Sequence, residues 1–147
     1  MNCNAYLDES LVSSVLNALE HRGLYETAGD LLQHLQRYQE AKSMFERCIL
    51  ILNQLTVSIN EWLSSRAACF PKLAELCRQH DPDELISVES KWGDFLFSRH
   101  RYEEAIERYI QSGNNKKAIE AALLAKRLDK AAELLQNLVA QRNVCDQ

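Results

Sequence analysis

The second half of the chain repeats one arrangement of apolar and polar positions every thirteen residues. Residues 88–139 divide into four such blocks, VESKWGDFLFSRH, RYEEAIERYIQSG, NNKKAIEAALLAK and RLDKAAELLQNLV. The apolar positions of the second block, Tyr102, Ala105, Ile106, Tyr109 and Ile110, follow the spacing i, i+3, i+4, i+7, i+8. Side chains at that spacing form one stripe of an α-helix. Each block therefore predicts a helix of about ten residues followed by a turn of about three.

The fifth position of each block and the turns between blocks predict how these helices pack. That position holds Trp92, Ala105, Ala118 and Ala131 in the four blocks, and the small alanine side chain lets neighbouring helices approach closely. Residues 112–115 read Ser-Gly-Asn-Asn, a combination typical of a helix end followed by the cap of the next helix.

An earlier copy of the pattern lies at residues 24–48, which align with residues 88–112 at a uniform offset of 64. The identical pairs are Gly29 with Gly93, Asp30 with Asp94, Leu32 with Leu96, Arg37 with Arg101, Tyr38 with Tyr102, Glu40 with Glu104 and Ala41 with Ala105. So many matches at one offset indicate an internal repeat.

The segment between the two copies departs from the pattern. Its apolar positions, Leu52, Leu55, Ile59, Trp62 and Leu63, predict that the preceding helix continues, and Pro71 is expected to end or kink a helix. A new helix is predicted from Pro82 to about Ser98, with Asp81 as its N-terminal cap and with Asp83 and Glu84 favourable to the helix dipole.

Short helices of this kind are marginal alone and must be stabilised by stacking on one another. The sequence therefore predicts an all-α fold, a right-handed α-solenoid of short antiparallel helix pairs. We expect a single segment over 1–147, with a first repeat block at 11–48, irregular longer helices at 49–80 and four short helices at 81–140. Its terminal helices are expected near residues 11–19 and 131–139, and we expect the chain to be a fragment of a longer array of such helices.

Composition supports the helical prediction, and charge limits the classes of partner that the chain is expected to bind. The 147 residues include only four glycines and two prolines, so residues that break helices are scarce. The net charge of −4 argues against nucleic acid as a partner, and the longest apolar run, residues 48–52, is too short to span a bilayer.

The chain shows no pattern typical of an enzyme or of a cofactor site. No nucleophile beside a base, phosphate loop or paired metal-binding motif occurs, so no catalytic residue, metal or cofactor is predicted. The one spacing that suggests zinc, Cys69, Cys77, His80 and Asp81, differs from that of ordinary zinc fingers and favours a structural role. The five cysteines are odd in number and lack close pairs, so we expect them to be reduced, with Cys48 and Cys69 buried.

The motif G-D-x-L followed by R-Y-x-E-A-x-x-x-[FY] resembles the tetratricopeptide repeat. Its small, alanine and aromatic positions are Gly29, Ala41 and Phe45 in the first copy and Gly93, Ala105 and Tyr109 in the second. The later blocks form helix pairs of 26 residues, shorter than the roughly 34 of that repeat, and lack its usual proline. In these two respects the later blocks resemble the shorter, irregular repeats of trafficking coat proteins more than the tetratricopeptide repeat.

A more specific resemblance covers residues 81–135, which look like the helical-repeat region of the large intraflagellar transport subunits. It rests on Trp92-Gly93-Asp94, on the helix from Ala105-Ile106 to Tyr109-Ile110, and on the run KAIEAA that begins at Lys117. Residues 11–48 fit more loosely. Such subunits have two N-terminal propellers and a long solenoid, so the resemblance implies a fragment of that solenoid or an unusually short relative.

That resemblance implies a scaffold in the cytoplasm, the cilium or flagellum and the basal body, where it binds other transport subunits or cargo proteins. The alternatives are a coatomer-like vesicle-coat segment and a co-chaperone type of peptide-binding repeat module. Against the latter, Asp30 and Asp94 would repel a peptide carboxylate.

Two features are candidate partner surfaces. Trp62 is either a core residue or an aromatic anchor for a partner. A basic cluster, Lys116, Lys117, Lys126, Arg127 and Lys130, is either a solvated face that pairs with nearby glutamates or a patch for an acidic protein or, more weakly, for lipid headgroups.

Overall fold

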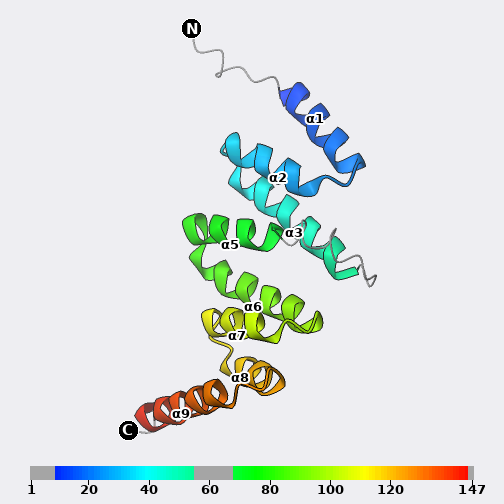
Figure 1. The fold of residues 1–147 in the computed structure, drawn as a ribbon. Helices are drawn as coiled ribbons and strands as arrows, with labels where there is room; N and C mark the ends of the chain where they lie inside the picture. The colour runs from blue at the N-terminus through cyan, green and yellow to red at the C-terminus, as the bar shows by residue number, and fades with distance from the viewer. Residues whose placement is uncertain (1–8, 55–67, 146–147) are drawn as a thin grey trace. The chain divides into compact units, whose positions relative to one another are not determined.

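The computed structural model describes residues 9–54 and 68–145, and within these residues all regular structure is helical, with no strand (Figure 1). The helices are α1 (Glu9–His21), α2 (Tyr25–His34), α3 (Tyr38–Gln54), α5 (Cys69–His80), α6 (Pro82–Ser98), α7 (Tyr102–Gln111), α8 (Asn115–Leu124) and α9 (Leu128–Cys145). The prediction of an all-α helical repeat is confirmed.

Contacts divide the chain into two compact units, Met1–Leu76 and Cys77–Gln147, so the boundary falls inside α5. In the first unit α1 packs against α2, and α2 packs against α3. In the second unit α6 packs against α7, α7 against α8, and α8 against α9. Packing between consecutive helices is the arrangement that a helical repeat requires.

The helix boundaries agree with the sequence pattern in the repeated blocks and differ from it at two places. The helices α7 and α8 have ten residues each, as predicted, and α6 begins at Pro82 and ends at Ser98, as predicted. The helix α9 has 18 residues and is longer than its block predicts. No glycine or proline occurs between Leu128 and Cys145, so no helix-breaking residue interrupts α9.

The second difference is the cap of α6. Asp81 occupies the N-cap position, but its side chain makes no capping hydrogen bond, so the predicted role of this side chain is wrong. Asp81 alone connects α5 to α6, and its backbone N–H donates to the carbonyl of Cys77 at 2.7 Å. Its own carbonyl accepts from the N–H of Glu84 at 3.2 Å, so the backbone closes this junction.

Pro71 lies in the first turn of α5, where the missing N–H of proline costs little. The preceding helix does continue past the first block, because α3 extends to Gln54. The rest of the predicted apolar face, at Leu55, Ile59, Trp62 and Leu63, lies outside the described residues.

One turn geometry closes three consecutive helices of the second unit. After α7, Gly113 has a φ of 75°, and the N–H of Asn114 donates to the carbonyl of Tyr109 at 2.9 Å. After α6 and α8 the same left-handed position is occupied by His100 and Lys126, each with a φ of 61°. The left-handed residue turns the chain back on itself and satisfies carbonyls at the helix end.

The small and aromatic positions of the repeat lie in the interior. Ala41, Ala105 and Ala118 are fully buried, as is Phe45, and the remaining members, Ala131 and Tyr109, are nearly so. In the second unit the repeat positions belong to one hydrophobic core, against which Trp92 also packs. The core consists of Leu96, Ala105, Ile106, Tyr109, Ala118, Ala121, Ala122, Ala131 and Leu134.

Each repeat glycine allows an aromatic ring to lie directly against a helix backbone. A Cβ atom added to Gly29 would lie 2.5 Å from the ring of Phe45, and one added to Gly93 would lie 2.7 Å from the ring of Tyr109. Both glycines are buried in the middle of helices. Glycine at these positions therefore permits a contact between neighbouring helices that any other residue would block.

We expect the Gly93→Ala substitution to destabilise the second unit, because the buried ring of Tyr109 must move to make room for the methyl group. Overpacking of this kind costs about 1–3 kcal/mol. Urea denaturation of wild type, Gly93→Ala, Tyr109→Leu and the double variant gives the coupling between the two sites. The cost of Gly93→Ala should fall when Tyr109 is shortened, and an equal cost in both backgrounds would contradict the contact.

Candidate protein interaction surfaces

The basic cluster predicted from the sequence is largely engaged in ion pairs of the second unit. Lys117 pairs with Asp94 at 2.9 Å, and Lys130 pairs with Glu133 at 3.6 Å. Arg127 bonds to Asp129 and to Glu103, and these carboxylates raise the pKa of Arg127. In the described part of the chain, Lys116 and Lys126 form no ion pair. The five side chains therefore do not form one unneutralised patch.

Trp62, the other candidate surface, lies outside the described residues. The second tryptophan, Trp92, is partly buried, and the guanidinium of Arg108 lies 4.2 Å from the centre of its ring. Arg108 also bonds to Glu89, which is 3% exposed, at 3.1 Å. Trp92 thus helps to cover a buried ion pair within the second unit.

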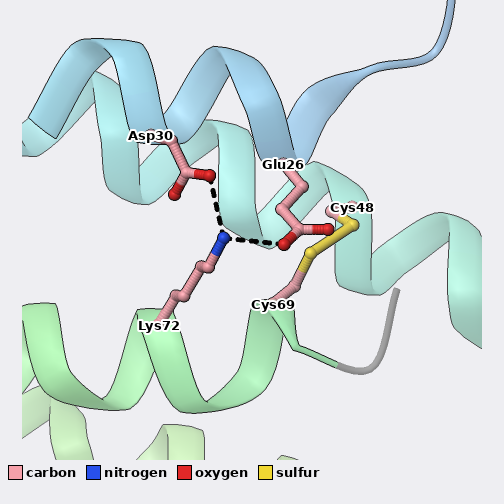
Figure 2. A network of polar contacts seen from close by, with 5 residues as sticks. All are labelled: Glu26, Asp30, Cys48, Cys69 and Lys72. Atoms are coloured by element: carbon pink, nitrogen blue, oxygen red, sulfur yellow. Dashed lines mark hydrogen bonds and ion pairs between the residues drawn. A yellow bond between two sulfur atoms is a disulfide. The ribbon is translucent and has the colours of Figure 1, made fainter. Parts of the chain in front are cut away.

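The two repeat aspartates each bind a lysine. Asp94 of α6 accepts hydrogen bonds from the hydroxyl of Tyr109 at 2.7 Å and from Nζ of Lys117 in α8 at 2.9 Å. In the first unit, Nζ of Lys72 in α5 donates to Asp30 at 2.8 Å and to Glu26 at 2.7 Å (Figure 2). A lysine therefore offsets part of the negative charge by which Asp30 and Asp94 were expected to repel a peptide carboxylate.

Burial affects the pKa of one group in each of these polar networks, Lys72 in the first unit and Tyr109 in the second. Burial of Lys72 would lower its pKa, but its hydrogen bonds to Asp30 and Glu26 outweigh this effect and hold the pKa above its ordinary value. Burial of Tyr109, followed by its hydrogen bond to Asp94, raises the pKa of the phenol.

The structure corrects the expectation that Cys48 and Cys69 are reduced. These buried side chains form a disulfide that joins α3 to α5, with their Cα atoms 6.7 Å apart (Figure 2). The sequence separation of 21 residues hides the pair, because the two residues meet across neighbouring helices. Cys77 is also buried and lies outside the disulfide.

Sequence reasoning missed a groove in the second unit. Its volume is about 840 Å³, and its walls come from one face of α6, from the turn between α7 and α8, and from α9. The lining includes Ile86, Lys91, Asn114, Lys116 and Leu138. The spacing of these residues along the chain shows no motif, so no sequence signal would have found the groove.

Within residues 9–54 and 68–145, no three His, Cys, Asp or Glu side chains gather as a metal site would require. Cys69, a member of the zinc-like spacing, belongs to the disulfide. No helix in the described residues has the length and apolar character needed to cross a membrane.

Comparison with known proteins tests the resemblance seen in the motifs. The chain matches no family model. It is 32% identical over 135 residues, 92% of its length, to intraflagellar transport protein 172 of Chlamydomonas reinhardtii, of which it covers 7%. It is 32% identical over 125 residues to the Homo sapiens homologue, covering 85% of this chain and 6% of that protein.

The chain is homologous to a segment of intraflagellar transport protein 172. The predicted resemblance to an intraflagellar transport subunit is therefore confirmed. A more distant relative, intraflagellar transport protein osm-1 of Caenorhabditis elegans, is 24% identical over 135 residues, again 92% of the chain and 7% of the relative. The chain thus spans about 7% of the length of such relatives.

The residues that suggested intraflagellar transport protein 172 are those that hold the second unit together. Trp92, Gly93 and Asp94 stand in succession on α6 and contact Arg108, Tyr109 and Lys117 respectively. The run that begins at Lys117 supplies the buried alanines of α8. The motif therefore describes packing between helices.

We expect Tyr109→Phe to show a pH-dependent cost. The folded protein holds the pKa of Tyr109 above the unfolded value near 10, so the neutral phenol stabilises the fold fully below that pH and loses this effect as the pH rises above it. Loss of the hydrogen bond to Asp94 should cost about 1.5–3 kcal/mol at pH 7. Urea denaturation between pH 7 and 11 should show this difference shrinking above pH 10; a constant difference would argue against the raised pKa.

We expect reduction of the Cys48–Cys69 disulfide to lower the free energy of unfolding by about 2–4 kcal/mol, because the reduced chain gains entropy when unfolded. The measurement is chemical denaturation with and without dithiothreitol. The double variant Cys48→Ala with Cys69→Ala should not respond to the reductant, whereas Cys77→Ala should respond as wild type does. Identical wild-type curves under both conditions would rule out the disulfide in solution.

Proposed function

We propose that this chain is a non-enzymatic scaffold segment of an intraflagellar transport complex, acting in cilium assembly. The observation that carries the proposal is its similarity, over about nine tenths of its length, to intraflagellar transport protein 172 from several organisms. The proposed partners are other subunits of the complex or cargo proteins. The proposed locations are the cytoplasm, the cilium or flagellum, and the basal body.

The packing of the repeated motif residues supports a structural role. Aromatic, acidic and basic side chains that would suggest chemistry in an enzyme are used here between helices: Tyr109 and Lys117 bind Asp94, and Arg108 binds Glu89. A segment whose polar side chains stabilise its own stack contributes shape and surface to an assembly.

An exposed apolar face on α9 supports the proposal that the chain is part of a longer solenoid. Leu128, Leu135 and Val139 are 68%, 49% and 57% exposed and lie on one side of the helix. One repeat earlier, the position equivalent to Leu135 is Tyr109, which forms a common core with the alanines of α8. By analogy, a further helix would cover this face of α9.

The test is affinity purification and imaging of the tagged chain in ciliated cells. We expect the chain to enrich other intraflagellar transport subunits and to enter cilia. The matched variant, Leu128→Glu with Leu135→Glu and Val139→Glu, alters only exposed positions of α9 and should reduce this enrichment while keeping a helical circular dichroism spectrum. If the wild-type chain neither enriches these subunits nor reaches cilia, the proposal fails.

A further inference from the structure

The groove of the second unit is lined by both apolar and polar side chains. Asp83, Ile86, Ser87, Ser90 and Lys91 line it from α6 at the spacing i, i+3, i+4, i+7, i+8, so a single face of the helix forms one wall. Ile86 is 56% exposed, and Leu138 of α9, which also lines the groove, is half-buried. The groove has a volume of about 840 Å³ and is wide open to solvent.

Two lysines share this groove without a neutralising acid. Lys91 of α6 and Lys116 of α8 both line it and are exposed, and neither forms an ion pair with any described residue. Two neighbouring pairs of charged groups are engaged with each other: Lys117 binds Asp94, and Glu89 binds Arg108. Two like charges facing one groove repel each other, and an anion between them would relieve that repulsion.

An acidic residue, Asp83, also lines the groove. Asp83 is eight residues before Lys91 on the same helix, which corresponds to about 12 Å along the axis. Because charge changes sign along this face of α6, an extended chain with carboxylates at one end would be oriented by it. The apolar side chains of Ile86 and Leu138, which also line the groove, suit aliphatic side chains.

We propose that this groove binds an extended acidic peptide segment of a partner protein. Carboxylates of the segment pair with Lys91 and Lys116, and its aliphatic side chains pack on Ile86 and Leu138. The proposal rests on the scaffold function proposed above and specifies the chemistry of one partner. It also assigns function to Lys116 of the basic cluster, whereas Lys117, Arg127 and Lys130 serve the fold.

Fluorescence anisotropy of the full chain with a labelled seven-residue peptide, which has aspartates at one end and leucines at the other, tests this site. We expect a Kd of about 10–100 µM at low salt, weakening as salt is added. The double variant Lys91→Glu with Lys116→Glu should weaken binding at least about tenfold, as expected for loss of two charge-assisted contacts. The matched control is Lys126→Glu, a change of the same charge at an exposed turn residue that does not line the groove.

Three results would overturn the proposal: no binding of the peptide, equal weakening by Lys126→Glu, or equal binding of a peptide with asparagine in place of aspartate. Binding to phosphatidylserine vesicles without binding to the peptide would also overturn it in favour of a lipid surface. Affinity purification with the Lys91→Glu, Lys116→Glu variant separates the two proposals. If this variant still enriches transport subunits, the scaffold function is intact, and the peptide measurement then tests the groove alone.

Discussion

The contact between a glycine in one helix and an aromatic ring from the next sets the spacing on which both units depend. Gly29 and Phe45 make it in the first unit, and Gly93 and Tyr109 make it in the second. The ring occupies the space that a side chain at the glycine would fill, so the two helix backbones lie close together. At this short separation the small alanine side chains are large enough to fill the space between the helices. Ten-residue helices, which are marginal alone, gain their stability from this packing.

The aspartate that follows each glycine extends the same contact to a third helix. Asp94 binds Lys117 of α8, and Asp30 binds Lys72 of α5, so each two-residue motif positions an aromatic ring and a lysine from two different helices. The two units differ in one detail: Tyr109 has a hydroxyl that donates to Asp94, whereas Phe45 has none. In the first unit the disulfide between Cys48 and Cys69 adds a covalent link between α3 and α5.

The sequence predicted the parts of the structure that periodicity controls. The offset of 64 residues identified both glycine–aromatic pairs as equivalent positions, and the thirteen-residue blocks located α7 and α8. Contacts between residues far apart in the chain could not be read in this way. The disulfide, the lysines on Asp30 and Asp94, and the groove beside Lys91 all depend on which helix faces which, a property that the spacing within one helix does not contain.

The surfaces proposed to bind partners, the exposed face of α9 and the groove, are those that the packing of helices leaves exposed. That packing depends on the glycine–aromatic contact being present in both units. Nuclear Overhauser spectroscopy of the labelled chain measures that contact directly. The account predicts cross-peaks from the α-protons of Gly29 to the ring of Phe45 and from those of Gly93 to the ring of Tyr109, with both glycines shifted by ring currents. Unshifted α-protons without cross-peaks to these rings, in a chain that is otherwise helical, would contradict it.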